Sequence, residues 1–149
     1  MAIVSLDYLN SVLPTSAPTD ALCAQDSSGT AMTLAISIPY TIPVASVYNQ
    51  GFTDNGNNTF TAGTTGVYRI TYSLDLAAAV ACTVEVAINS TAVPSLTQNV
   101  LAATSSVFAD SIVSLATGDI VSLTATAPAI GVLTLSAGVG AILSVVQLG

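Results

Sequence analysis

The side chains that could do chemistry are almost all acids, because eight aspartates and glutamates accompany one basic residue, Arg69, and no histidine. A pair of carboxylates can hydrolyse a glycosidic bond, and the candidate pairs are Asp75 with Glu85 and Asp110 with Asp119. Carboxylates near strand turns usually serve solubility, however, and the chain lacks the tryptophan in which glycosidase sites are rich. Nucleophilic catalysis by Ser–His or Ser–Lys is excluded. We therefore expect no enzyme and no catalytic residue.

Metal sites and cofactors are equally poorly supported. Residues 53–58 read Thr-Asp-Asn-Gly-Asn-Asn, which loosely resembles a calcium loop but has one acid and no closing glutamate. A hairpin turn explains this segment better. Cys23 and Cys82 lack any histidine or second cysteine at zinc-ligand spacing. Cys82 alternates with valines as a buried strand residue does, whereas Cys23 lies in a polar segment, so we expect two free thiols rather than a disulfide.

The charge balance also restricts the partners. One arginine against a net charge of −7 cannot neutralise phosphates, so nucleic-acid binding is excluded. Apolar residues make up 52% of the chain and charged residues only 6%, which indicates a membrane or partner subunits. Residues 120–149 carry no charge, but Pro128 and glycines at 131, 138 and 140 interrupt them. Two buried strands joined by a Gly-rich turn fit this segment better than a membrane helix, so we expect self-association and no membrane insertion.

The elements that must position these residues begin after a different kind of segment. Residues 1–30 are rich in Ser, Thr, Ala, Pro and Asp, and we assign them to an N-terminal extension. Within it, Ile3, Leu6, Leu9 and Leu13 have helical spacing, so a short helix and a poorly ordered lead-in are both open. Residues 31–149 form a single domain of short β-rich runs separated by turn residues.

The clearest strand is Gly66–Leu76, in which apolar and polar residues alternate over eleven positions. A similar alternation over Val80–Ile88 predicts a second strand. The expected core side chains of these two strands are Tyr68, Ile70, Tyr72, Val84 and Val86. Further strands are expected at 34–38, 42–48, 97–101, 105–115, 119–125, 131–136 and 141–148, with hairpin turns at 53–58, 117–119 and 137–138. About eight to ten short strands without a convincing helix predict an all-β sandwich or barrel.

Several stretches resemble a known family. Residues 59–61, Thr-Phe-Thr, followed by Gly66-Val-Tyr-Arg-Ile-Thr-Tyr72, are similar to the third-strand signature of C1q/TNF-like jelly rolls. The same strand, residues 83–94 and the ending from 116–123 through 144–148 resemble the C-terminal domains of BclA-type collagen-like glycoproteins of bacterial spore exosporia. The resemblance covers roughly residues 42–149.

The resemblance implies a homotrimeric jelly roll of antiparallel strands. In C1q/TNF-like trimers the strand that matches Gly66–Leu76 belongs to the inner sheet, with one face toward the threefold axis. Arg69, Thr71 and Ser73 would then face neighbouring subunits; alternatively, Arg69 is an ordinary solvated strand residue. We favour the interface because the only cation of the chain is of most use against a carboxylate of another subunit, and because arginine is enriched at interfaces. Related trimers can hold calcium near the axis, but no residue here matches a ligand pattern.

The resemblance further implies a structural head that assembles and displays a collagen-like filament at the outer, extracellular face of the exosporium. The sequence departs from this pattern because residues 1–149 contain no Gly-X-Y repeat. The chain is therefore either the tip of a longer protein or a short phage or cell-surface relative. The alternative function is a receptor- or glycan-binding module, such as a phage fibre tip or adhesin, with residues 54–58 and 89–94 as the candidate loops.

Overall fold

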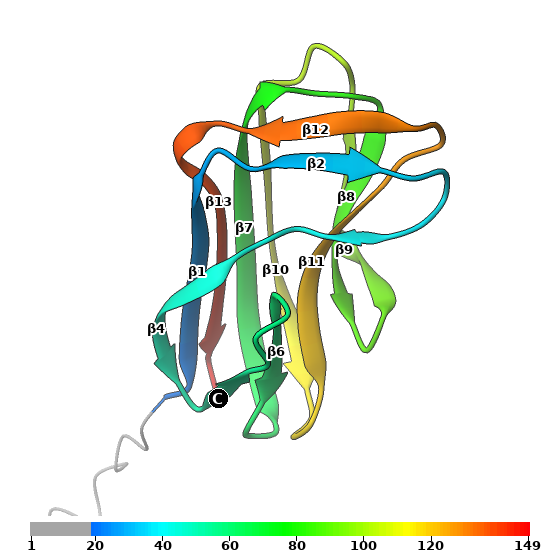
Figure 1. The fold of residues 1–149 in the computed structure, drawn as a ribbon. Helices are drawn as coiled ribbons and strands as arrows, with labels where there is room; N and C mark the ends of the chain where they lie inside the picture. Colours follow the sequence, from blue (N-terminus) through cyan, green and yellow to red (C-terminus); the bar gives the residue numbers. More distant parts are fainter. Residues whose placement is uncertain (1–18) are drawn as a thin grey trace, which may run out of the picture.

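The computed structural model describes residues 19–149, and all regular secondary structure in this range is β-strand (Figure 1). The strands are β1 (Ala21–Ser28), β2 (Ala31–Leu34), β3 (Tyr40–Thr41), β4 (Ala45–Gln50), β5 (Phe52–Asp54), β6 (Thr59–Ala62), β7 (Gly66–Ala78), β8 (Cys82–Ile88), β9 (Thr91–Val100), β10 (Ser106–Leu115), β11 (Ile120–Thr126), β12 (Gly131–Leu135) and β13 (Ala137–Gln147). The expected all-β class is confirmed. The thirteen strands exceed the expected eight to ten because four of them are only two to four residues long.

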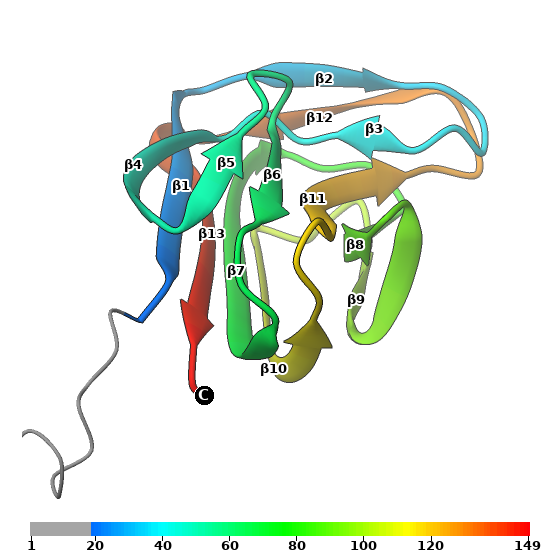
Figure 2. The same ribbon diagram turned by 90° about the horizontal axis from the view of Figure 1, so that it is seen from below.

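The strands form two antiparallel sheets that pack face to face. The first sheet has the order β2-β12-β7-β13-β1-β4, with β10 also paired to β7. The second has the order β5-β6-β11-β8-β9, with β3 also paired to β11. Figures 1 and 2 show β7, β13 and β1 side by side in the first sheet, and β11 and β8 in the second. In sequence order, consecutive strands often change sheets, so the two sheets depend on each other.

The core lies between the sheets and follows the alternation of the sequence. Tyr68, Ile70 and Tyr72 of β7 point inward, as do Val84 and Val86 of β8, and all five are fully buried. The alternate residues of β7 are exposed or half-buried on the other face of the first sheet. One surface of each sheet is therefore committed to the core, and the opposite surface remains outside.

The domain begins earlier than the sequence indicated. The N-terminal extension was expected to run to residue 30, but residues 21–28 form β1, which pairs with β13 and β4. Leu22 and Ala24 of β1 are buried in the core. Only two apolar residues of this strand point inward, and the strands that pair with it lie far along the chain. Its alternation is therefore too short to distinguish it from a polar segment without regular structure. The helix considered for Ile3–Leu13 lies outside the described residues.

The turns divide into those that join paired strands and those that change direction. Residues 53–58 form the expected β5–β6 hairpin, with Gly56 at a positive φ of 76° and its N–H donating to Asp54 Oδ1. Residues 117–119 do not form a hairpin, because β10 and β11 belong to different sheets. The turn at 137–138 is not a hairpin either. Both β12 and β13 pair with β7, along successive parts of that strand.

Strand boundaries differ from expectation near proline. The expected strand 42–48 is shifted to β4, which begins at Ala45 after Pro43, and the expected strand 34–38 is not formed, because β2 already ends at Leu34, before Pro39. Strand β9 begins at Thr91 rather than at 97, even though it contains Pro94. This proline is tolerated because β9 is the edge strand of the second sheet, where a missing N–H breaks no ladder. No helix among residues 19–149 has the length and apolar character needed to span a membrane.

Candidate subunit interface

The exposed face of the first sheet is the surface opposite the core on β10, β7, β13, β1 and β4. Its central row runs across the sheet through Asp110, Thr71, Ser144, Cys23 and Tyr48, which the strand registers place in line. Tyr48 on the edge strand β4 is exposed, and the three middle residues are half-buried. The row is polar at β10 and becomes more apolar toward β4.

The two flanking rows are more apolar. One contains Phe108, Ser73 and Ile142, and the other contains Ile112, Arg69 and Val146. Phe108 and Ile112 on β10 are each 62% exposed, so neither belongs to the core of the subunit. Because β10 is also the edge of its sheet, exposed apolar side chains and unpaired backbone groups coincide there. Such an edge is a site for association unless it is covered.

An ion pair lies within these rows. Arg69 Nε donates to Asp110 Oδ1 at 2.9 Å, and its Nη2 donates to the other carboxylate oxygen. The Thr71 hydroxyl donates to Asp110 Oδ1 at 3.0 Å. The guanidinium and then the Thr71 hydroxyl lower the pKa of Asp110, and the carboxylate raises the pKa of Arg69. The bidentate geometry fixes both side chains on the face and neutralises both charges within one subunit. The carboxylate that pairs with Arg69 was expected in another subunit, but it belongs to the same chain.

The structure places the three predicted interface residues on this face. Arg69 is exposed, whereas Thr71 and Ser73 are half-buried between β10 and β13. Phe108 and Ile112 were not expected at the interface, because β10 carries apolar residues on both of its faces. The available signal was Asp110 between them, which marks the outward face of an alternating strand.

Neither carboxylate pair considered for glycoside hydrolysis is assembled. Asp75 lies on the first sheet and Glu85 on the second. Asp110 is bonded to Arg69, whereas Asp119 accepts hydrogen bonds from the backbone N–H of Ala116 and from Asn89. The Ala116 bond, then the Asn89 bond, lower the pKa of Asp119. In each pair the two acids therefore lie in different parts of the fold, each with its own neighbours.

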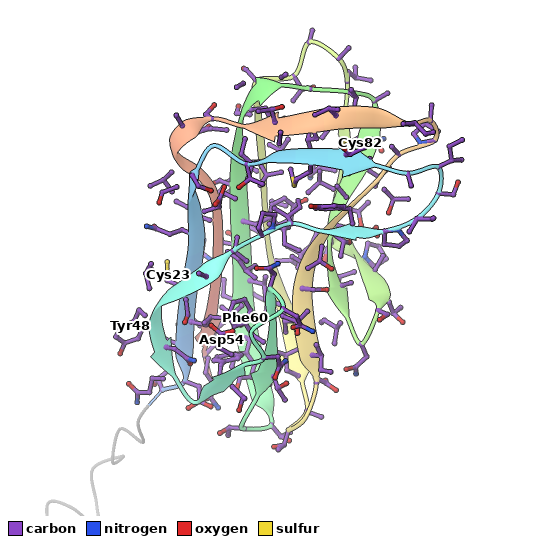
Figure 3. The ribbon with its side chains drawn as sticks, viewed as in Figure 1. Cys23, Tyr48, Asp54, Phe60 and Cys82 are labelled. Atoms are coloured by element: carbon purple, nitrogen blue, oxygen red, sulfur yellow. The ribbon has the colours of Figure 1, made fainter. Side chains whose placement is uncertain are left out.

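The thiols and the calcium-like loop also have structural roles. Cys23 of β1 and Cys82 of β8 are free thiols in different sheets, as Figure 3 shows. Burial raises the pKa of Cys82. Asp54 accepts a hydrogen bond at each carboxylate oxygen, one from the Gly56 N–H in its own hairpin and one from the Ser46 hydroxyl of β4. Across residues 19–149 no three histidine, cysteine or acidic side chains gather as metal ligands would.

The fold is a TNF-like jelly roll. Murine APRIL at pH 8.0 superposes with a TM-score of 0.62 at 14% identity, over 87% of this chain and 99% of that one. Eiger TNF from S. frugiperda gives a TM-score of 0.64 at 14% identity, covering 89% of this chain and 94% of its own. The PRD1 vertex protein P5 gives 0.61 at 15% identity, with 88% and 98% covered. At these identities the likeness establishes the fold alone.

The sequence comparison identifies the family within this class. Residues 22–149 match the BclA C-terminal domain, so the chain belongs to that family. The match begins one residue after the start of β1 and includes every strand that follows. No curated protein matches the chain significantly.

Proposed function

We propose that this domain is a non-enzymatic head that assembles as a homotrimer through the exposed face of the first sheet. The observation that carries the proposal is the coincidence, on one face, of the edge strand β10, the exposed Phe108 and Ile112, and the Arg69–Asp110 pair. The family membership supports this proposal, because the resemblance to BclA-type and C1q/TNF-like heads implies a homotrimer. In this arrangement Arg69, Thr71 and Ser73 contact neighbouring subunits.

The driving force is the burial of apolar strand faces. Each Å² of apolar surface removed from water contributes about 25 cal/mol, so the flanking rows favour association. In a threefold arrangement the contact is heterologous, with the β10 side of one subunit against the β1–β4 side of the next. Arg69 and Asp110 enter this contact already paired, so neither brings an uncompensated charge. Assembly then stabilises the folded subunit by mass action.

The mass of a β10 variant tests this interface. Ile112→Asp puts a charge on the apolar row, and we expect it to run as a folded monomer in light scattering behind size exclusion at concentrations where the parent chain is a trimer. Leu101→Asp is the matched control, because Leu101 is 67% exposed in the loop between β9 and β10 and does not belong to this face. If Ile112→Asp were still a trimer, or if Leu101→Asp were a monomer, the interface would not be the exposed face of the first sheet.

We further propose that the head belongs to a collagen-like glycoprotein filament at the outer surface of the exosporium. The support for this location is the family, whose members resemble this chain over nearly all of the domain. Antibodies against the domain should label intact spores of the source organism before any permeabilisation. Label that appears only after the spore coat is opened would contradict a surface location.

A further inference from the structure

We propose that the exposed face of the second sheet carries a binding site for a neutral saccharide. The site is a recess of about 350 Å³ over β11 and β8, bounded by β3 and by the Asn89–Ser90 turn. This volume lies within the range of about 300–1,000 Å³ that small-molecule sites occupy and suits one or two sugar rings. The site is independent of the proposed trimer, because it lies on the sheet opposite the candidate interface.

The recess exists because its floor is made of small side chains. Ser122 and Thr124 of β11 lie beside Ala87 and Glu85 of β8, in register, on the outward face of the sheet. Ser122, Thr124 and Ala87 are 8%, 6% and 4% exposed, which is nearly as buried as the core residues that alternate with them. Longer neighbours rise around this floor, among them Ile120. A hollow with a polar floor therefore interrupts the face of the sheet.

The recess is lined by two polar groups that lack a partner within the described residues. Thr124 Oγ1 is buried and has no partner among residues 19–149. Glu85 is a carboxylate without a cation, because the chain has one basic side chain, Arg69, and it is paired with Asp110 on the other sheet. Two further residues with hydroxyl groups, Thr41 and Ser90, also line the recess. A sugar supplies what this set lacks, since its hydroxyls can donate to the Glu85 carboxylate and exchange hydrogen bonds with the protein hydroxyls.

The lining also selects against other ligands. Phosphates and acidic sugars would face Glu85 with no compensating cation in a chain of net charge −7. Pro39, Ala87 and Ile120 give the hollow apolar surface on which the C–H groups of a ring can lie. Neutral polyhydroxyl compounds match both properties.

The wall at one end is held in place before any ligand binds. Asn89 and Ser90 both have positive φ, 52° and 66°, in the tight turn between β8 and β9. Asn89 donates through its amide nitrogen to Asp119 Oδ1 and accepts the N–H of Ile120 through its amide oxygen, both at 2.9 Å. These bonds tie the turn to β11, so a ligand does not have to order it.

The test is ligand-observed saturation-transfer NMR on the full chain with methyl glycosides of glucose, galactose, mannose and N-acetylglucosamine. We expect saturation transfer to at least one of them. Glu85→Gln, which keeps the shape of the side chain, should weaken that binding at least tenfold by titration calorimetry. Ala87→Leu should abolish it by filling the floor. Far-UV circular dichroism and the solution mass show whether each variant folds and assembles as the parent does.

Asp75→Asn is the matched control, because it makes the same charge change on β7 of the first sheet, outside the recess. It should leave the affinity unchanged. The proposal is overturned if none of the four glycosides gives saturation transfer, if Glu85→Gln binds as tightly as the parent, or if Asp75→Asn loses binding to the same extent. Binding that depends on Glu85 but is seen only with an amine, tested as 1,5-diaminopentane, would equally overturn it.

Discussion

At the scale of single residues, the hydroxyl groups of two tyrosines on β7 show how polar groups are accommodated in the core. The Tyr72 hydroxyl is shared between the carbonyl oxygens of Val84, at 3.1 Å, and Leu96, at 2.9 Å. It thereby connects β7 to both β8 and β9 across the sandwich. Tyr68 instead donates to the carbonyl oxygen of Thr64 at 2.6 Å, close to the surface.

We expect Tyr72→Phe to lower the free energy of unfolding by about 1–3 kcal/mol, because it leaves two buried carbonyls without this donor. Tyr68→Phe should cost less, since water can reach the exposed Thr64. Urea denaturation followed by fluorescence or circular dichroism compares the two variants. Equal losses, or a larger loss for Tyr68→Phe, would show that the Tyr72 hydroxyl does not hold the sheets together.

The alternation of the sequence predicted which of these side chains point inward, but not what their hydroxyls bind. The inward positions follow from a local period of two. The partners of Tyr72 lie 12 and 24 residues away on other strands, so only the assembled sandwich brings them together. The pairing of Arg69 with Asp110 was missed for the same reason, because the two residues are 41 positions apart.

At the scale of elements, the corner between β12 and β13 determines how the last two strands join the first sheet. Gly138 turns the chain there with a positive φ of 84°, and Gly140 follows where β13 passes close to Ser136 and Leu135. A Cβ on Gly140 would lie 2.6 Å from the carbonyl oxygen of Ser136 and 2.8 Å from the Leu135 Cβ. Both contacts are closer than packed atoms allow.

Gly140→Ala should therefore destabilise the fold by roughly 1–3 kcal/mol, the usual cost of forcing extra volume into packed structure. Gly149→Ala is the control, because nothing lies within 4 Å of a Cβ there. Differential scanning calorimetry should show a lower transition temperature for the first variant and none of this loss for the second. A Gly140→Ala variant as stable as the parent would mean that the corner can relax.

Strands of long, regular alternation could be predicted from the sequence, and strands that depend on distant partners could not. The expected ranges 66–76, 105–115 and 119–125 lie close to β7, β10 and β11. The β1 strand was not expected, because only its pairing with β13 and β4, and no pattern in its own residues, shows that it is a strand. The expected 137–138 hairpin was wrong because glycine-rich turns have the same signature whether they join neighbours or redirect a strand.

At the scale of the whole molecule, the scarcity of titratable groups determines the response to pH. Hydrogen bonds lower the pKa values of Asp110 and Asp119, so their contributions are present above the unfolded value, about 3.9, and are lost as the pH falls through the folded values. Burial raises the pKa values of Tyr72 and Cys82, so their contributions are lost as the pH rises past the unfolded values.

Between these limits no histidine titrates, because the chain has none. We expect the thermal transition temperature to be nearly constant between about pH 5 and 8 and to fall below about pH 4 and above about pH 9. Scanning calorimetry across this range, at constant ionic strength and protein concentration, provides the measurement. A marked change of stability between pH 5 and 8 would contradict this account.

The resemblance also predicted more than composition could. Composition and charge excluded nucleic-acid binding and indicated association, whereas the jelly-roll class and the family came from the order and spacing of particular stretches such as Gly66–Tyr72. Of the recess on the second sheet, only the Asn89–Ser90 turn lay within a loop considered for binding, and the floor could not be predicted. Its floor joins residues of β8 and β11 that are more than 30 positions apart, and small side chains on an outward face carry no signal of their own.

The measurement that tests the central claim most directly is the solution mass of the chain, by light scattering behind size exclusion, with and without a chelator. The account predicts about three times the 14.8 kDa of one chain in both conditions. A trimer that dissociates on chelation would contradict a metal-free interface and would place a cation at the contact between subunits. A stable monomer would contradict assembly through the exposed face of the first sheet.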